Sequence, residues 1–133
     1  MTVDLVIKGG NIATPKGTFR AAIAIDEGKI VSIGMDACMP TADRVIDADG
    51  LYVLPGIIDA HVHFREPGLE YKEDFYTGSL AAVYGGVTSV CDMPNVNPPT
   101  QDASSFKLKL ERALEKSLVD FGIFGVVLPT NLD

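Results

Sequence analysis

The chain has 133 residues, about the length of one ordinary domain, and 47% of them are apolar, which is enough to form a buried core. Its net charge of −7 argues against nucleic acid or an anionic membrane as a partner, because phosphate binding needs clustered basic residues. The sequence shows neither a signal-peptide pattern nor an apolar stretch of the ~18–20 residues that span a bilayer. Two cysteines cannot form a disulfide framework, so a soluble, cytoplasmic protein is predicted.

Residues 1–54 are predicted to form a small β module. Glycine-containing pairs (9–10, 27–28 and 49–50) separate short apolar or β-branched runs, which suggests antiparallel hairpins in a small sheet or sandwich. The clearest hairpin turn is "DEGK" at 26–29. No group of ligand-like residues occurs in this half. The expected strands are "DLVIK" (4–8), "AAIAID" (21–26), "KIVSIG" (29–34) and "RVIDA" (44–48).

Residues 55–133 change to alternating strands and helices. Strands are predicted at "GIIDAHVHF" (56–64), "VTSVCDM" (87–93) and "DFGIFGVVL" (120–128). One helix is expected over 74–84, ended by Gly85-Gly86, and a second is expected to begin at Asp102. This alternation is typical of a parallel sheet. The predicted apolar helix faces are Tyr76, Leu80, Val83 and Tyr84 for the first helix, and Phe106, Leu110, Ala113 and Leu114 for the second.

The length of the second half limits the fold. A closed barrel of eight strand–helix units needs about 250 residues, and the residues after Leu54 suffice for about two and a half units. The sequence therefore predicts a truncated chain or one part of a larger protein.

Both histidines of the chain lie in "GIIDAHVHFREPG", at 56–68. His61 and His63 are two residues apart on a predicted strand, so they face one side, at the carboxyl end where parallel α/β folds place their sites. Two neighbouring imidazoles suit a metal such as zinc. A lone His-x-His pair is more often coincidental, but Asp59 before this pair and Arg65 after it favour a site.

The stretch "DAHVHFREPG" (59–68) resembles the signature of dihydroorotases, in the cyclic amidohydrolase branch of the amidohydrolase superfamily. The segment "TGSLAAVYGGVTSVCDMPNVNPPT" (77–100) is similar to the one that follows it in that family. The resemblance implies an α/β fold: the start of a metal-dependent (β/α)8 TIM barrel over 55–133, preceded by a small β-sandwich portion over 1–54.

The same resemblance assigns site residues. His61 and His63 are implied to be ligands of one or two zinc ions, and His63, Arg65 and Asn95 to contact the substrate, with Arg65 and Asn95 holding its carboxylate. The planar guanidinium of arginine matches a carboxylate. The implied reaction closes N-carbamoyl-L-aspartate to dihydroorotate plus water, in pyrimidine biosynthesis. The remaining metal ligands and the acid–base aspartate lie downstream in the family, so no catalytic residue is expected in this chain, and these 133 residues alone are expected to be inactive.

Alternative functions remain open at this point. Allantoinase and hydantoinase or dihydropyrimidinase act on ring substrates without a comparable carboxylate, so Arg65 favours dihydroorotase, as does "MPN" (93–95). Val96 departs from the threonine that the family often has there. A non-catalytic, amidohydrolase-like assembly protein is a different class, although such proteins commonly lose the metal ligands. The expected partners are a small-molecule substrate and either a homo-oligomer or an assembly with further polypeptide.

Several other polar residues are interpreted as structural. Asn95 also fits a turn before Asn97-Pro98, and Cys91 fits a small core residue. The acidic cluster of Glu66, Glu70, Glu73 and Asp74 is predicted to be charge in a loop and in the first helical turn.

Overall fold

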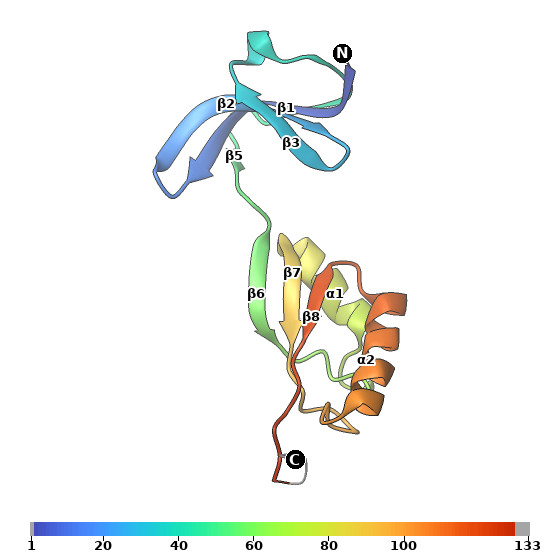
Figure 1. Cartoon of the computed structure of the whole chain (residues 1–133). Helices are drawn as coiled ribbons and strands as arrows, with labels where there is room; N and C mark the ends of the chain where they lie inside the picture. Colours follow the sequence, from blue (N-terminus) through green and yellow to red (C-terminus); the bar gives the residue numbers. More distant parts are fainter. Residues whose placement is uncertain (1, 130–133) are drawn as a thin grey trace. The chain divides into compact units, whose positions relative to one another are not determined.

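The computed structural model describes residues 2–129. They divide into two compact units, Met1–Pro55 and Gly56–Asp133. The first unit is built from strands with one short 3-10 helix, and the second alternates strands with helices (Figure 1). The division falls beside the boundary expected at Leu54. That the two units are portions of a sandwich and of a barrel remains a prediction.

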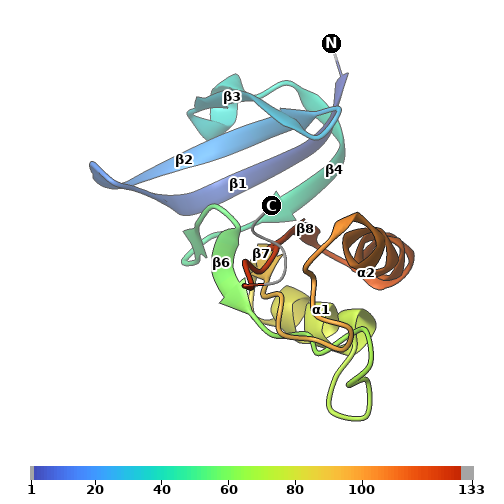
Figure 2. The ribbon, with the colours of Figure 1, turned by 60° about the horizontal axis from the view of Figure 1, so that its bottom comes forward.

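The first unit is a single five-stranded sheet with the strand order β3-β2-β1-β4 (Figure 2). Its hairpins β1–β2 and β2–β3 are antiparallel, as predicted. The sheet also contains pairings other than the expected antiparallel hairpins, because β4 and β5 run parallel to β1. The segment through the 3-10 helix η1 returns the chain to the end where β1 begins, so Thr41 pairs with Thr2. The elements are β1 (Thr2–Thr14), β2 (Gly17–Asp26), β3 (Lys29–Gly34), η1 (Asp36–Cys38), β4 (Thr41–Asp47) and β5 (Tyr52–Val53).

The core of this sheet follows the alternation of its strands. Val6 and Ala24 are buried in one cluster, and Ile12 and Ile23 in another, so apolar side chains are covered on both faces. The sequence predicts that the glycines at 9–10 end a strand, and the structure shows otherwise. They form an irregularity inside β1, which continues to Thr14. The predicted turn at 26–29 is present, with positive φ at Glu27 and Gly28.

The second unit is a three-stranded parallel sheet in the order β6-β7-β8. Both helices pack on the same face of this sheet (Figure 1), because one core cluster joins Phe75 of α1 and Ala113 of α2 to Val90 of β7. The predicted alternation is confirmed as the start of a parallel β/α arrangement, with a third strand shorter than expected. The elements are β6 (Ile57–Val62), α1 (Phe75–Tyr84), β7 (Val87–Asp92), α2 (Ala103–Lys116) and β8 (Asp120–Ile123).

The helix starts lie where the sequence predicts them. Asp74 caps α1 and Asp102 caps α2, each accepting a hydrogen bond from the backbone of the residue three positions on, Thr77 or Ser105. Between residues 2 and 129, neither helix is long and apolar enough to cross a membrane.

The predicted apolar face of α1 is wrong. Tyr76, Val83 and Tyr84 are exposed, whereas Phe75, Gly78 and Ser79 are buried. The physical reason is close packing, because a Cβ at Gly78 would collide with the ring of Phe64. Small residues let the helix approach the residues that follow β6.

The predicted face of α2 is partly wrong in the same way. Phe106 and Leu114 are exposed, whereas Ser105, Lys109 and Ala113 are buried. Lys109 is in the core because it has a buried carboxylate partner, which apolar periodicity does not reveal.

Candidate functional site

The two histidines lie together at the carboxyl end of β6. Their ring centroids are 5.1 Å apart and the rings meet edge to face at 64°. The pairing of β6 with β7 is irregular here, because β6 uses one residue more than β7 between the Asp59–Val90 and Val62–Asp92 pairs. Such bulges are common beside active sites, where they redirect side chains. The structure thus brings His61 and His63 together as predicted, with His61 exposed and His63 half-buried.

Asn95 joins this pair from the loop after β7. Its Oδ1 lies 2.8 Å from His63 Nδ1. Because an amide oxygen only accepts, this contact is a hydrogen bond in the tautomer of His63 that carries its proton on Nδ1, and that tautomer has its lone pair on Nε2. A histidine oriented in this way is typical of metal ligands. The interpretation of Asn95 as a substrate contact remains a prediction, and its amide NH2 group is the part able to donate to a carboxylate.

Arg65 sits at the apex of a tight turn formed by Phe64, Arg65 and Glu66, which we call the Arg65 turn. The backbone N–H of Glu66 donates to the carbonyl of Phe64 at 2.8 Å, and φ of Arg65 is +65°. A three-residue turn with positive φ at a non-glycine centre is rare and strained, and such strain is concentrated at functional sites. Within residues 2–129 the guanidinium of Arg65 forms no ion pair. It is therefore a cation that a ligand carboxylate could neutralise.

Glu66 is buried, in contrast to the loop charge expected from the sequence. Only 1% of it is exposed, and its carboxylate accepts from Lys116 Nζ at 2.8 Å and from the backbone N–H of Phe75 at 3.1 Å. Lys116 also lies 3.3 Å from Asp74. The hydrogen bond to Glu66 raises the pKa of Lys116 above its usual value, against the opposing effect of desolvation. Lys116 is therefore charged at neutral pH.

The loops after β6 and β7 dock directly on each other. Asn97 donates its backbone N–H to the carbonyl of Pro67 at 2.9 Å. Gly68 has φ of +86°, and a Cβ there would collide with the carbonyl of Asn97. A glycine at position 68 is thus needed for this close approach.

A buried ion pair beneath the site was missed by the sequence analysis. Asp92 and Lys109 are both 0% exposed, with Asp92 Oδ2 and Lys109 Nζ 2.6 Å apart. Asp92 Oδ1 accepts the backbone N–H of Phe64 at 2.8 Å, and Lys109 donates to the carbonyl of Met93 at 2.6 Å. The sequence gives one signal for this pair, which is helical spacing. Lys109 lies four residues from both Ser105 and Ala113, and all three residues are on the buried face of α2.

The histidine pair fits part of a metal site. Imidazole nitrogens are ordinary zinc ligands, but stable zinc sites use three or four protein ligands. Residues 2–129 contain no cluster of three or more histidine, cysteine or acidic side chains able to hold a metal ion.

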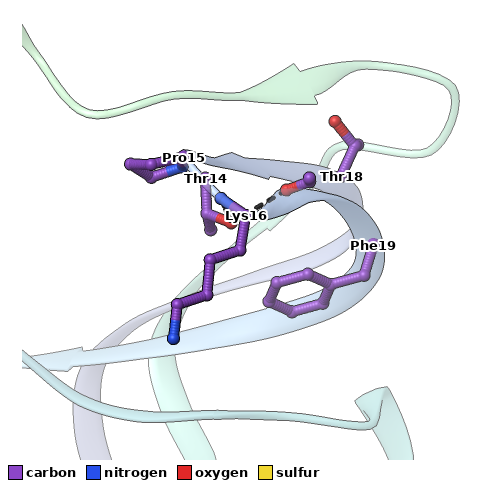
Figure 3. Close-up of a pocket in the computed structure, with 6 residues that line it drawn as sticks. Thr14, Pro15, Lys16, Thr18 and Phe19 are labelled. Atoms are coloured by element: carbon purple, nitrogen blue, oxygen red, sulfur yellow. Dashed lines mark hydrogen bonds between the residues drawn. The ribbon is translucent and has the colours of Figure 1, made fainter.

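The surface has a hollow at the β1–β2 hairpin and another beside His63. One lies at the β1–β2 hairpin and is lined by the exposed residues 14–19, among which Lys16 is the single charged side chain (Figure 3). It holds no set of groups suited to catalysis. A hollow of about 290 Å³ adjoins His63 and is lined also by Asp59, Glu73 and apolar residues of α1 and β7. The second hollow is thus lined by two carboxylates, Asp59 and Glu73, as well as by His63.

The site thus combines a histidine pair at the end of a parallel strand, an asparagine bonded to one of them, and an arginine on a strained turn. Imidazole nitrogens are possible metal ligands and a guanidinium can pair with an anion. Residues 52–132 match the Amidohydrolase family, and the chain belongs to that family. It corresponds to the amino-terminal portion of the family's proteins.

Relatives of two kinds are similar in sequence. The chain is 52% identical to the dihydroorotase of Methanosarcina mazei over 93% of its own length and 27% of that protein. It is 42% identical to the allantoinase of Deinococcus radiodurans over 100% of its length and 30% of that protein. Among solved structures, the L-hydantoinase (dihydropyrimidinase) of Arthrobacter aurescens matches 98% of this chain and 29% of its own, with a TM-score of 0.92 and 34% identity. The chain therefore spans less than a third of these relatives.

Proposed function

We propose that these residues form the amino-terminal part of a zinc-dependent dihydroorotase, which interconverts N-carbamoyl-L-aspartate and dihydroorotate plus water. The observation that carries this proposal is Arg65. Its guanidinium has no ion-pair partner within residues 2–129, and it lies two residues from His63 on a strained turn. Dihydroorotate carries a carboxylate beside the ring, which an arginine recognises with two parallel hydrogen bonds.

Each site residue has a physical role in this proposal. His61 and His63 hold zinc through imidazole nitrogens, and Asn95 fixes His63 through Nδ1. The bound metal would supply a Lewis acid and an activated water for the ring amide. Arg65 binds and orients the carboxylate, which places the ring relative to the histidines. The proton-transferring carboxylate is expected in the part of the protein beyond this chain.

The alternatives within the family are allantoinase and hydantoinase or dihydropyrimidinase. Their relatives are similar to this chain at 42% and 34% identity, so overall similarity alone does not exclude them. The alternative from another class is a non-catalytic assembly protein, which both retained histidines disfavour. A small-molecule substrate, assembly into homo-oligomers or with further polypeptide, and a cytoplasmic location remain parts of the proposal.

The deciding experiment uses the full-length protein and three substrates: dihydroorotate, allantoin and hydantoin. We expect turnover of dihydroorotate alone. Arg65→Ala should raise the transition-state free energy for dihydroorotate by about 2–5 kcal/mol, the range for a desolvated charge pair that loses one partner. Its zinc content should not change, because Arg65 is not a ligand. An undiminished rate in Arg65→Ala would favour allantoinase or hydantoinase, and a protein without zinc or activity would favour the assembly role.

A further inference from the structure

Both neighbours of Arg65 in the chain are fixed by buried carboxylates. The backbone N–H of Phe64 donates to Asp92 Oδ1 at 2.8 Å. On the other side, the carboxylate of Glu66 accepts from Lys116 Nζ at 2.8 Å and from the N–H of Phe75 at 3.1 Å. Asp92 is 0% exposed and Glu66 1%. The strained turn is therefore held at both ends by charged groups removed from water.

A single helix supplies the cations for both carboxylates. Lys109 contacts Asp92 and Lys116 contacts Glu66, and both lysines belong to α2. They are seven residues apart, which is about two turns of an α-helix, so they lie on one face. That face is the one turned to the core, where Ser105 and Ala113 are also buried.

This arrangement explains how an unfavourable backbone conformation can persist. A non-glycine residue with positive φ relaxes unless the surrounding structure over-determines it. Within residues 2–129 only Glu27 and Arg65 are non-glycine residues of this kind. Glu27 lies in an exposed hairpin turn, whereas the Arg65 turn lies between the buried Asp92–Lys109 pair and the partly buried Glu66–Lys116 pair.

We propose that Lys109 and Lys116 are positioning residues, which act through Asp92 and Glu66 to hold the Arg65 turn in the conformation that presents its guanidinium to the substrate carboxylate. The inference rests on the proposed function, because it takes Arg65 as the carboxylate-binding residue. It goes beyond the proposed function because it gives α2 a part in binding that carboxylate, although no residue of α2 contacts the substrate in the proposal. Lys116 is the better residue to test, since its side chain is 29% exposed and its replacement is tolerated more easily than that of Lys109.

The test compares Lys116→Met with Lys107→Met in the full-length protein. Lys107 is the matched control, because it lies on the same helix with 77% of its side chain exposed. We expect Lys116→Met to raise the KM for dihydroorotate about ten- to hundredfold, the effect of a misplaced binding group, with zinc content unchanged. Lys107→Met should leave KM, kcat and zinc content as they are. Lys116→Arg should restore most of the lost affinity, since it keeps the charge.

A double-mutant cycle separates positioning from general support of the structure. If Lys116 acts through Arg65, Lys116→Met should change KM by less than about twofold in an Arg65→Ala background, because the affected contact is already absent. An equal effect in both backgrounds, or an unchanged KM in Lys116→Met alone, would overturn the inference while leaving the proposed function intact. An unchanged rate in Arg65→Ala would overturn the proposed function itself, and this inference with it.

A second variant covers the case in which Lys116→Met does not fold. Glu66→Gln keeps the size of the side chain and an oxygen acceptor for the N–H of Phe75, but removes the charge that Lys116 neutralises and replaces the acceptor facing Lys116 with an NH2 donor. It should raise the KM for dihydroorotate in the same direction, by about threefold or more. A KM unchanged in Glu66→Gln would count against the inference.

Discussion

Replacement of Lys109 by methionine tests the buried ion pair beneath the site. The substitution keeps a long, unbranched side chain on α2 but removes the ammonium group that lies 2.6 Å from Asp92 Oδ2. Because Asp92 is fully buried, the variant leaves a carboxylate in the core without a counter-charge. It also removes the hydrogen bond that Lys109 donates to the carbonyl of Met93.

The expected magnitude follows from these two losses. Removing one partner of a buried pair costs about 3–5 kcal/mol, most of it from the charge left behind. The unpaired carbonyl of Met93 would cost about 1–3 kcal/mol on its own. Both losses result from removing the same ammonium group, so the two free energies are not summed. In the double variant Asp92→Asn, Lys109→Met the buried charge is gone, and the amide oxygen can still accept from Phe64. Its cost should therefore fall to about 1–3 kcal/mol.

The assay is urea unfolding of the full-length protein, followed by circular dichroism. Lys107→Met again serves as the control and should shift the unfolding free energy by less than about 0.5 kcal/mol. The double variant should be more stable than Lys109→Met alone. If it is equally unstable or worse, the penalty does not come from the stranded carboxylate, and the reasoning is wrong.

Three further outcomes are expected. Residues 1–133 expressed alone should bind zinc weakly, because His61 and His63 give two of the three or four ligands that a stable site uses; stoichiometric zinc after dialysis would contradict this. The N–H of Ser105, with Ser104 and the Ser105 hydroxyl, lowers the pKa of Asp102 from 3.8 to about 2. The contribution of this cap to stability should thus be present above pH 3.8 and lost as the pH falls through about 2, and an NMR titration midpoint near 3.8 would refute it. Residues 1–133 alone should form large oligomers, because Ile57 and Ile58 of the edge strand β6 are exposed; light scattering that shows a 14.2 kDa monomer would contradict this.

Sequence patterns predicted the elements of this chain better than their packing. Helix starts were found because Asp74 and Asp102 carry their own local signal, a side chain that caps the following backbone. The direction of β4 was missed, since parallel or antiparallel pairing depends on where a connection returns the chain and not on the strand's composition. The helix faces were misassigned because close packing at Gly78 matters more than the position of tyrosines.

The proximity of the candidate site residues was predicted where they lie close in sequence or at the ends of neighbouring strands. His61 and His63 are brought together by strand geometry, and Asn95 meets His63 because β6 and β7 are parallel neighbours. The supports of the site were not found, since Glu66 and Lys109 read as ordinary surface charges in a sequence. Their burial depends on partners 50 and 17 residues away, at Lys116 and Asp92.

The choice among the related activities depends on local geometry more than on overall likeness. Dihydroorotase and allantoinase relatives match nearly this whole chain in sequence and a hydantoinase matches it in structure, so overall likeness does not encode the difference between their substrates. A substrate carboxylate needs a cation held at a fixed place, and an arginine on a relaxed loop would lose much of its binding free energy in becoming ordered. In the proposed role of Arg65, the buried carboxylates on both sides of the Arg65 turn would lower the backbone part of that loss, because they fix the turn before a ligand binds. Specificity for an anionic ring would then require the lysines of α2 as well as the arginine, and a relative that kept Arg65 but lost Lys116 should bind the carboxylate less well.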